Sequence, residues 1–63
     1  MWVEVTSPDG HAIMVNLEHV ECVRPANPLA GDNRKAKCVL MLESGHSQAV
    51  TEDYAHMRAL VMH

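Results

Sequence analysis

The chain has 63 residues and a formal net charge of −3 with its five histidines neutral. A chain of this length forms one domain, here residues 1–63, and buries only about 60% of the surface that its unfolded form exposes. Proteins that bind nucleic acid through phosphates are usually basic, so the overall charge argues against that class. No apolar run approaches the roughly 18 residues of a membrane-spanning helix. The start of the chain also lacks the basic residues of a signal peptide, and we therefore expect a cytoplasmic protein with no membrane partner.

The first part of the chain is predicted to form two β-strands joined by a tight turn, with a third strand after them. Apolar and polar residues alternate along the first two strands, as they do in a strand with one buried face. Pro8 presets the φ angle of the turn and Gly10 accepts a positive φ. Asn16 is suited to cap a helical turn, and Pro25 ends the third strand because it cannot donate to a ladder. The expected elements are strands over 2–6, 11–15 and 20–25 and a helical turn over 16–20.

The later part of the chain repeats the same strand–turn–strand pattern, now centred on Gly45. The segment 37–43 is apolar on both faces, because Cys38, Leu40 and Leu42 alternate with Val39 and Met41. This pattern predicts a central strand that is covered on both sides. The return strand is expected over 46–50.

The segment 26–36 has the composition of a loop, and it is long for a domain of this size. We expect it to carry any binding function that depends on a loop.

A helix of about 11 residues is expected at the end of the chain, since such a helix would present one apolar stripe to the sheet. Thr51 is predicted to cap it, with two acids in its first turn. The stripe consists of Tyr54, Met57, Leu60 and Val61. The expected fold class is therefore α+β, with about five short antiparallel strands curled into a small, partly open barrel and the helix across one opening.

The two cysteines leave several chemical roles open. With His19 and His46, Cys22 and Cys38 could offer a tetrahedral zinc site, but the short Cys-x2–4-Cys knuckle of structural zinc sites is missing. Both cysteines lie in apolar strand patterns, which favours buried, protonated thiols, and a disulfide between them stays open. The chain has no common nucleophile or phosphate-binding motif. We therefore expect no metal, no cofactor, no catalytic residue and no enzymatic activity.

Three groups of residues are candidates for contacts at the surface. Trp2 could meet a partner or cover one end of the barrel. His11 and His46 each follow a turn glycine and either form a pH-sensitive pair or simply begin a return strand. A basic cluster could contact an anion or nucleic acid, or keep a sheet edge from pairing. The cluster consists of Arg24, Arg34, Lys35 and Lys37.

The order of short motifs along the chain resembles the small FlbD-type flagellar proteins and similar short bacterial proteins. The residues that carry the resemblance are Trp2-Val3-Glu4-Val5, Asp9-Gly10, Val15-Asn16, Val20, Val23, Leu40-Met41-Leu42-Glu43-Ser44-Gly45 and Val50-Thr51-Glu52. The long loop and the five histidines depart from that pattern. The resemblance implies a small, non-enzymatic accessory or regulatory protein and transfers no catalytic or ligand residue.

These patterns together predict a non-enzymatic module that acts by protein–protein contact and forms a homodimer or a higher homo-oligomer. The contact is expected at Trp2, Val39 and Met41, because one helix can cover only one face of the strand over 37–43. The alternative is a small nucleic-acid-binding regulator that uses the basic cluster.

Overall fold

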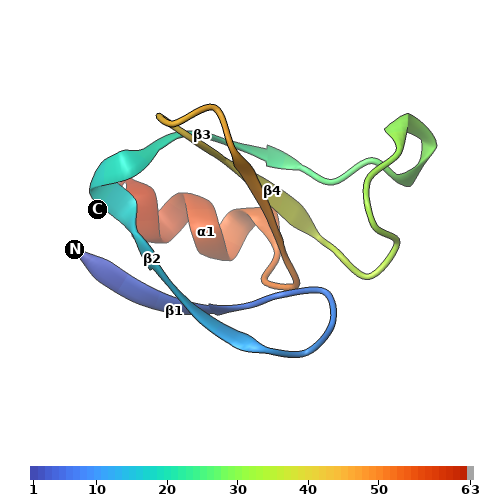
Figure 1. Cartoon of the computed structure of the whole chain (residues 1–63), viewed down its shortest axis with the longest axis horizontal. Helices are drawn as coiled ribbons and strands as arrows, with labels where there is room; N and C mark the ends of the chain where they lie inside the picture. Colours follow the sequence, from blue (N-terminus) through green and yellow to red (C-terminus); the bar gives the residue numbers. More distant parts are fainter. Residues whose placement is uncertain (63) are drawn as a thin grey trace.

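The computed structural model describes residues 1–62 as an α+β domain with five strands in two antiparallel sheets and one C-terminal helix (Figure 1). The first sheet is a two-stranded hairpin, and the second has three strands with β4 in the middle. The elements are β1 (Trp2–Thr6), β2 (Ala12–Asn16), the 3-10 turn η1 (Leu17–His19), β3 (Val20–Pro25), the 3-10 turn η2 (Pro28–Ala30), β4 (Cys38–Leu42), β5 (Ser47–Val50) and α1 (Tyr54–Val61).

The strand order and the C-terminal helix confirm the predicted fold class, whereas the predicted barrel is not confirmed. Within residues 1–62 the two sheets share no strand pairing. Single hydrogen bonds tie them together instead. The Thr51 N–H donates to the Thr6 carbonyl (2.8 Å), and the Thr6 N–H donates to the Glu52 carboxylate (2.9 and 3.1 Å).

The two strand–turn–strand segments, centred on Gly10 and Gly45, each form a β-hairpin, as their composition predicts. Gly10 and Gly45 adopt φ angles of 90° and 89°, a region that side chains with a Cβ rarely enter. In the short helical turn, the Asn16 side chain accepts a hydrogen bond from the Glu18 N–H (3.1 Å), which confirms its capping role.

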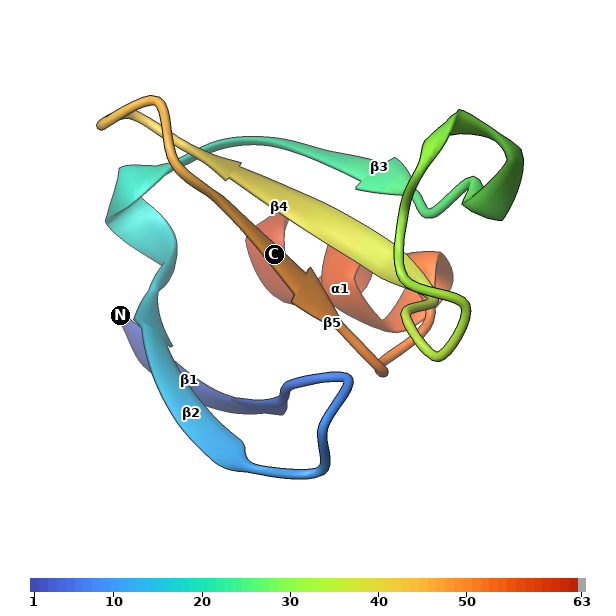
Figure 2. The same cartoon turned by 45° about the vertical axis from the view of Figure 1, so that its right-hand side comes forward.

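The core lies where the hairpin, the three-stranded sheet and α1 meet (Figures 1 and 2). Leu40 from β4 and Met57 from α1 are each 0% exposed. Full burial of one such side chain contributes about 1.5–3 kcal/mol, which matters in a chain this short. The buried core cluster is Val5, Val15, Cys38, Leu40, Val50 and Met57.

The helix begins later than the sequence predicts. Asp53, and not Thr51, is its N-cap, and the Asp53 carboxylate accepts a hydrogen bond from the His56 N–H (2.8 Å). Thr51 lies in a bend before the helix, and its N–H donates to the Thr6 carbonyl. The helix therefore has eight residues. Only Met57 of the predicted stripe is fully buried; Leu60 is half-buried, and Tyr54 and Val61 are 38% and 37% exposed.

A β-bulge in β3 overturns the prediction that both cysteines are buried. The register with β4 shifts between Val20 and Cys22, so Cys22 is exposed while Cys38 is buried. Cys22 pairs with Met41 across the ladder and therefore lies on the face of the sheet opposite to Cys38. Both thiols are free, and this arrangement leaves no route to a bridge between them within one chain.

Candidate functional site

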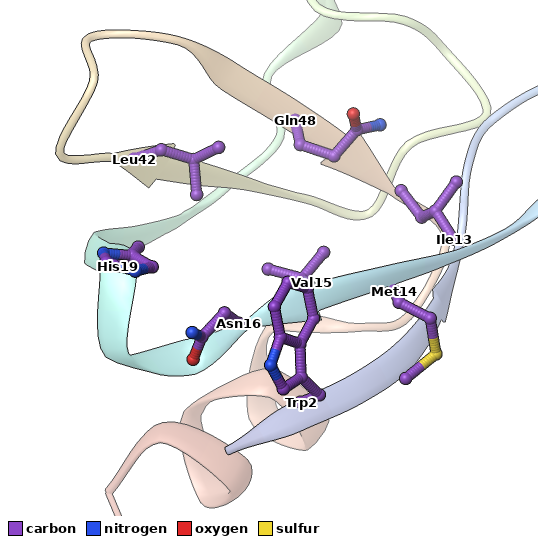
Figure 3. Close-up of a pocket in the computed structure, with 8 residues that line it drawn as sticks. All are labelled: Trp2, Ile13, Met14, Val15, Asn16, His19, Leu42 and Gln48. Carbon is purple, nitrogen blue, oxygen red and sulfur yellow. The ribbon is translucent and has the colours of Figure 1, made fainter.

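A groove between β2 and β5 is the best-formed candidate site in residues 1–62 (Figure 3). Its volume is about 320 Å³, at the lower end of the range for pockets that hold ligands. No Asp, Glu, Lys or Arg side chain lines it, and a histidine lies at one end. The lining residues are Trp2, Ile13, Met14, Val15, Asn16, His19, Leu42 and Gln48.

Two large apolar side chains of the groove are exposed. Trp2 is 63% exposed and Met14 is 57% exposed. They lie on adjacent strands, because Trp2 is opposite Asn16 and Met14 is opposite Glu4 in the hairpin register. Figure 3 shows Trp2 and Met14 at the groove, and the hairpin register places both on the face opposite to that of Val15. An exposed Trp and Met side by side are typical of a contact surface for another protein.

The backbone edge of β2 that borders the groove is unpaired. Hydrogen bonds from Ser7 N–H to the His11 carbonyl and from Leu17 N–H to the Met1 carbonyl (both 2.8 Å) extend the hairpin ladder at its two ends. Hydrogen-bonded and non-hydrogen-bonded pairs alternate in an antiparallel ladder, so the odd-numbered residues of β2 are the ones bonded to β1. The backbone groups of Ala12, Met14 and Asn16 therefore face away from β1.

The opposite wall of the groove is the outer edge of β5, and it is partly closed. The Leu42 N–H donates to the His46 carbonyl (2.9 Å), so the same alternation turns the backbone groups of Ser47 and Ala49 away from β4. The Gln48 side-chain amide donates to the Ala49 carbonyl (2.8 Å), which leaves that carbonyl less available to a partner strand.

The structure brings only Trp2 of the predicted partner-binding residues to the groove. Val39 is 3% exposed within the single chain, so its burial needs no second subunit. Met41 is half-buried and lies on the same face of the sheet as Val39. Met14 is the contact residue that sequence reasoning missed. The signal was its place with Ala12 on the outer side of the return strand, next to Trp2 on the first strand, because neighbouring exposed apolar residues form a patch.

The basic cluster is divided by an ion pair inside the loop. The Arg24 guanidinium donates to both carboxylate oxygens of Asp32 (2.8 and 3.1 Å), and the Asn27 N–H donates to the same carboxylate (2.7 Å). The hydrogen bonds from Arg24, together with that of Asn27, lower the pKa of Asp32 to about 2. Arg34, Lys35 and Lys37 are exposed on the loop, but Arg24 is already neutralised by its partner.

The buried cysteine and the two turn histidines each have a local hydrogen-bond or ionic partner. The Cys38 thiol donates to the Glu52 carbonyl (3.3 Å), and burial raises its pKa. His11 lies 3.2 Å from the Asp9 carboxylate and His46 lies 3.0 Å from the Ser44 hydroxyl, so each has a partner within its own turn. In this part of the chain, no three His, Cys, Asp or Glu side chains are grouped as metal ligands.

Comparison of the chain with protein-family models, with curated proteins and with solved structures found no match in any of the three. The resemblance to FlbD-type proteins therefore stays a prediction. Within residues 1–62, no helix combines the length and the apolar character that crossing a bilayer requires.

Proposed function

We propose that this protein is a non-enzymatic interaction module that forms a homodimer, with the groove between β2 and β5 as part of its contact surface. The observation that carries the proposal is the pair of exposed apolar side chains, Trp2 and Met14, next to an unpaired strand edge. Such a surface gains apolar burial and backbone hydrogen bonds from the same partner.

The groove can also be related to the partly open barrel that the sequence predicts. We propose that the two sheets act as the walls of one partly open barrel, and that the groove is its open side. A partner at the groove would then cover Leu42 and Ile13, which are only half-buried in the single chain.

No catalytic role is part of this proposal. The Cys38 thiol is buried and its raised pKa favours the unreactive protonated form. We also propose the cytoplasm as its compartment, where two free cysteines stay reduced.

The oligomeric state tests the proposal directly. Light scattering over a concentration series up to about 1 mM, a range that detects weak association, is expected to show a monomer–dimer equilibrium. Met14→Glu places a charge at the contact and is expected to raise the dimer dissociation constant at least about tenfold. Met62→Glu is the matched control, because Met62 is 69% exposed at the far end of α1. A wild-type chain that stays monomeric throughout, or equal effects of the two variants, would contradict the proposal.

Nucleic-acid binding is the second candidate, and the ordered loop favours it. The Arg24–Asp32 pair and the Asn27 N–H hold the loop that presents Arg34, Lys35 and Lys37. Three phosphate contacts would give a slope of log K against log salt of about −2.7 for duplex DNA. Lys35→Glu with Lys37→Glu is expected to abolish such binding, and binding that ignores both the salt and these changes would end this candidate.

A further inference from the structure

The charges of this chain are divided unevenly between one loop and the rest of the molecule. Residues 24–37 hold four of the five basic side chains and one of the eight acids, Asp32. The remaining residues hold seven acids and one basic side chain, Arg58. The Arg24 guanidinium binds the Asp32 carboxylate (2.8 and 3.1 Å), so the loop keeps three further cations for other contacts. A polyanion is therefore attracted to this end of the molecule and repelled by the rest.

The loop between β3 and β4 is held in shape by its own hydrogen bonds. The Ala26 N–H donates to the Lys37 carbonyl (3.0 Å) and closes the loop at its base. In its first half, the turn η2, the Asn27 side chain accepts from the Leu29 N–H (3.0 Å). Its second half is a turn over 33–36. Both halves project from the same end of the three-stranded sheet (Figures 1 and 2), so a ligand there meets a preformed surface.

The tip of η2 exposes an apolar side chain that the core does not use. Leu29 is 98% exposed, and its neighbours Pro28 and Ala30 are exposed as well. The three cations that remain for other contacts follow in and next to the second turn, and all are exposed: Arg34, Lys35 and Lys37. The loop therefore combines one uncharged apolar tip with a basic flank.

We propose that this loop binds the minor groove of duplex DNA, with Leu29 inserted at a base step and the three cations on the phosphates beside it. Proteins that bind in this way insert Leu, Pro or another apolar side chain between two base pairs, and they use Arg and Lys for the polar contacts. The insertion unstacks the step and bends the duplex. This inference rests on the second candidate function, nucleic-acid binding, and adds the kind of nucleic acid, the groove and the inserted residue.

The composition of the loop favours duplex DNA over other polyanions. Single strands are bound by aromatic side chains on which the bases stack, and residues 24–37 contain no aromatic residue. The minor groove of duplex RNA is wide and shallow, which suits a narrow tip less well. Stable anchoring to an anionic bilayer takes a larger apolar surface or two separate anchors, whereas this loop offers one large apolar side chain. A base step accepts a single side chain of this size.

The charges also set the expected strength of binding. Three phosphate contacts give a slope of log K against log salt of about −2.7, and the seven acids outside the loop repel the duplex. We therefore expect a dissociation constant of about 100 μM near physiological salt, at the weak end of non-specific DNA binding. Binding is expected to become tighter as the salt concentration falls.

Two duplexes of about 20 base pairs, or about two helical turns, test the proposal with the full chain. Both are A·T-rich, because the narrow minor groove of such DNA attracts Arg and Lys. One carries a central mismatch beside a 2-aminopurine, a base analogue that fluoresces when it is unstacked. Because a mismatched base costs less to unstack, the wild-type chain is expected to bind this duplex several times more tightly and to raise its fluorescence. Anisotropy titrations over a salt series give the affinities and the slope.

Two variants separate the inserted side chain from the phosphate contacts. Leu29→Ala is expected to keep the salt slope but to lose both the preference for the mismatched duplex and the rise in fluorescence. Lys35→Glu with Lys37→Glu is expected to abolish binding to both duplexes. Met62→Ala is the matched control for Leu29→Ala, because Met62 is 69% exposed at the end of α1, and it is expected to behave as the wild-type chain does. Circular dichroism checks that every variant is folded.

The outcomes separate the insertion from nucleic-acid binding itself. If the wild-type chain binds both duplexes equally and without a rise in fluorescence, or if Leu29→Ala changes neither the preference nor the fluorescence, the insertion is overturned while nucleic-acid binding stands. If the chain binds a single strand of the same sequence, or vesicles containing phosphatidylglycerol, more tightly than either duplex, the assignment to duplex DNA is overturned. If it binds no nucleic acid at about 50 mM salt, where phosphate contacts are strong, both are overturned.

Discussion

At the scale of single residues, Leu40 is the side chain on which the stability of this small domain depends most directly. It is 0% exposed in the central strand and belongs to the core that the sheets and the helix share. Leu40→Ala is expected to lower the free energy of unfolding by about 2–5 kcal/mol, because it leaves a cavity as well as losing burial. Leu29→Ala makes the same change at a side chain that is 98% exposed, and its effect is expected to stay within about 0.5 kcal/mol. Urea denaturation measures both, and similar costs for the two would contradict the assigned core.

Glu52 links the two ends of the chain through its carboxylate. Burial alone would raise its pKa, but the hydrogen bonds from the Thr6 N–H help to outweigh burial, and the pKa lies below the usual value of 4.5. A lowered pKa in the folded state stabilises the protein above pH 4.5, and this contribution is lost as the pH falls through the folded-state pKa.

Glu52→Gln is therefore expected to lower the free energy of unfolding at pH 7 by about 1 kcal/mol, the net size of a typical hydrogen bond, because Gln keeps one acceptor oxygen but loses the charge. The difference from wild type is expected to shrink as the pH falls below 4.5. Glu21→Gln is the control, because it makes the same change at an exposed carboxylate. Thermal melts from pH 7 to about pH 3, which spans the usual Glu titration, measure both. A constant difference at every pH would exclude this role.

At the scale of elements, the loop between β3 and β4 is ordered by one carboxylate. Asp32 binds Arg24 and the Asn27 N–H, and the short turn η2 lies between Asn27 and Asp32. Asp32→Ala is expected to free the loop, because no other charged contact of this kind spans it in residues 1–62. Trypsin is then expected to cleave after Arg34 and Lys35 several times faster than in the wild-type chain.

The control for the loop is Asp9→Ala, the same substitution in the turn between β1 and β2. Its hydrogen bond with the Ser7 hydroxyl lies within that turn, so cleavage at Arg34 is expected to keep its wild-type rate. Equal acceleration by both variants would mean that global unfolding, and not release of the loop, exposes the site.

At the scale of the whole molecule, the last segment holds the two sheets together. Thr51 and Glu52 bond to Thr6, and Met57 fills the core between the sheets. A chain that ends after Val50 is expected to lose its cooperative melting transition, because it exposes this core and frees the edge of β1. In the full-length chain, Met57→Asp buries a charge and is expected to do the same, whereas His56→Asp, at an exposed neighbouring position, is expected to fold. Differential scanning calorimetry measures the melting transition of each variant. A truncated chain with an unchanged transition would contradict this role of the helix.

Local patterns predicted most of the elements because their causes are local. The alternation of apolar and polar residues indicates where the strands lie. A glycine permits each turn, and Asn16 caps the short 3-10 turn that follows β2. The bulge in β3 and the exposure of Cys22 were missed, since a bulge depends on how β3 aligns with β4. The site was only partly predictable for a similar reason. Trp2 stood out as the only tryptophan, but the role of Met14 depends on which edge of the hairpin stays open.

The sequence alone determined the hairpins, the α+β class and the uncharged strand Ala12–Asn16, because periodicity and turn chemistry act over a few residues. Tertiary structure decided what depends on contacts between distant segments. It joined the Thr51 N–H to the Thr6 carbonyl while Asp53 capped the helix, and it paired Arg24 with Asp32. It also placed the outer edge of β2 beside a groove, because that groove forms between segments that are far apart in the chain.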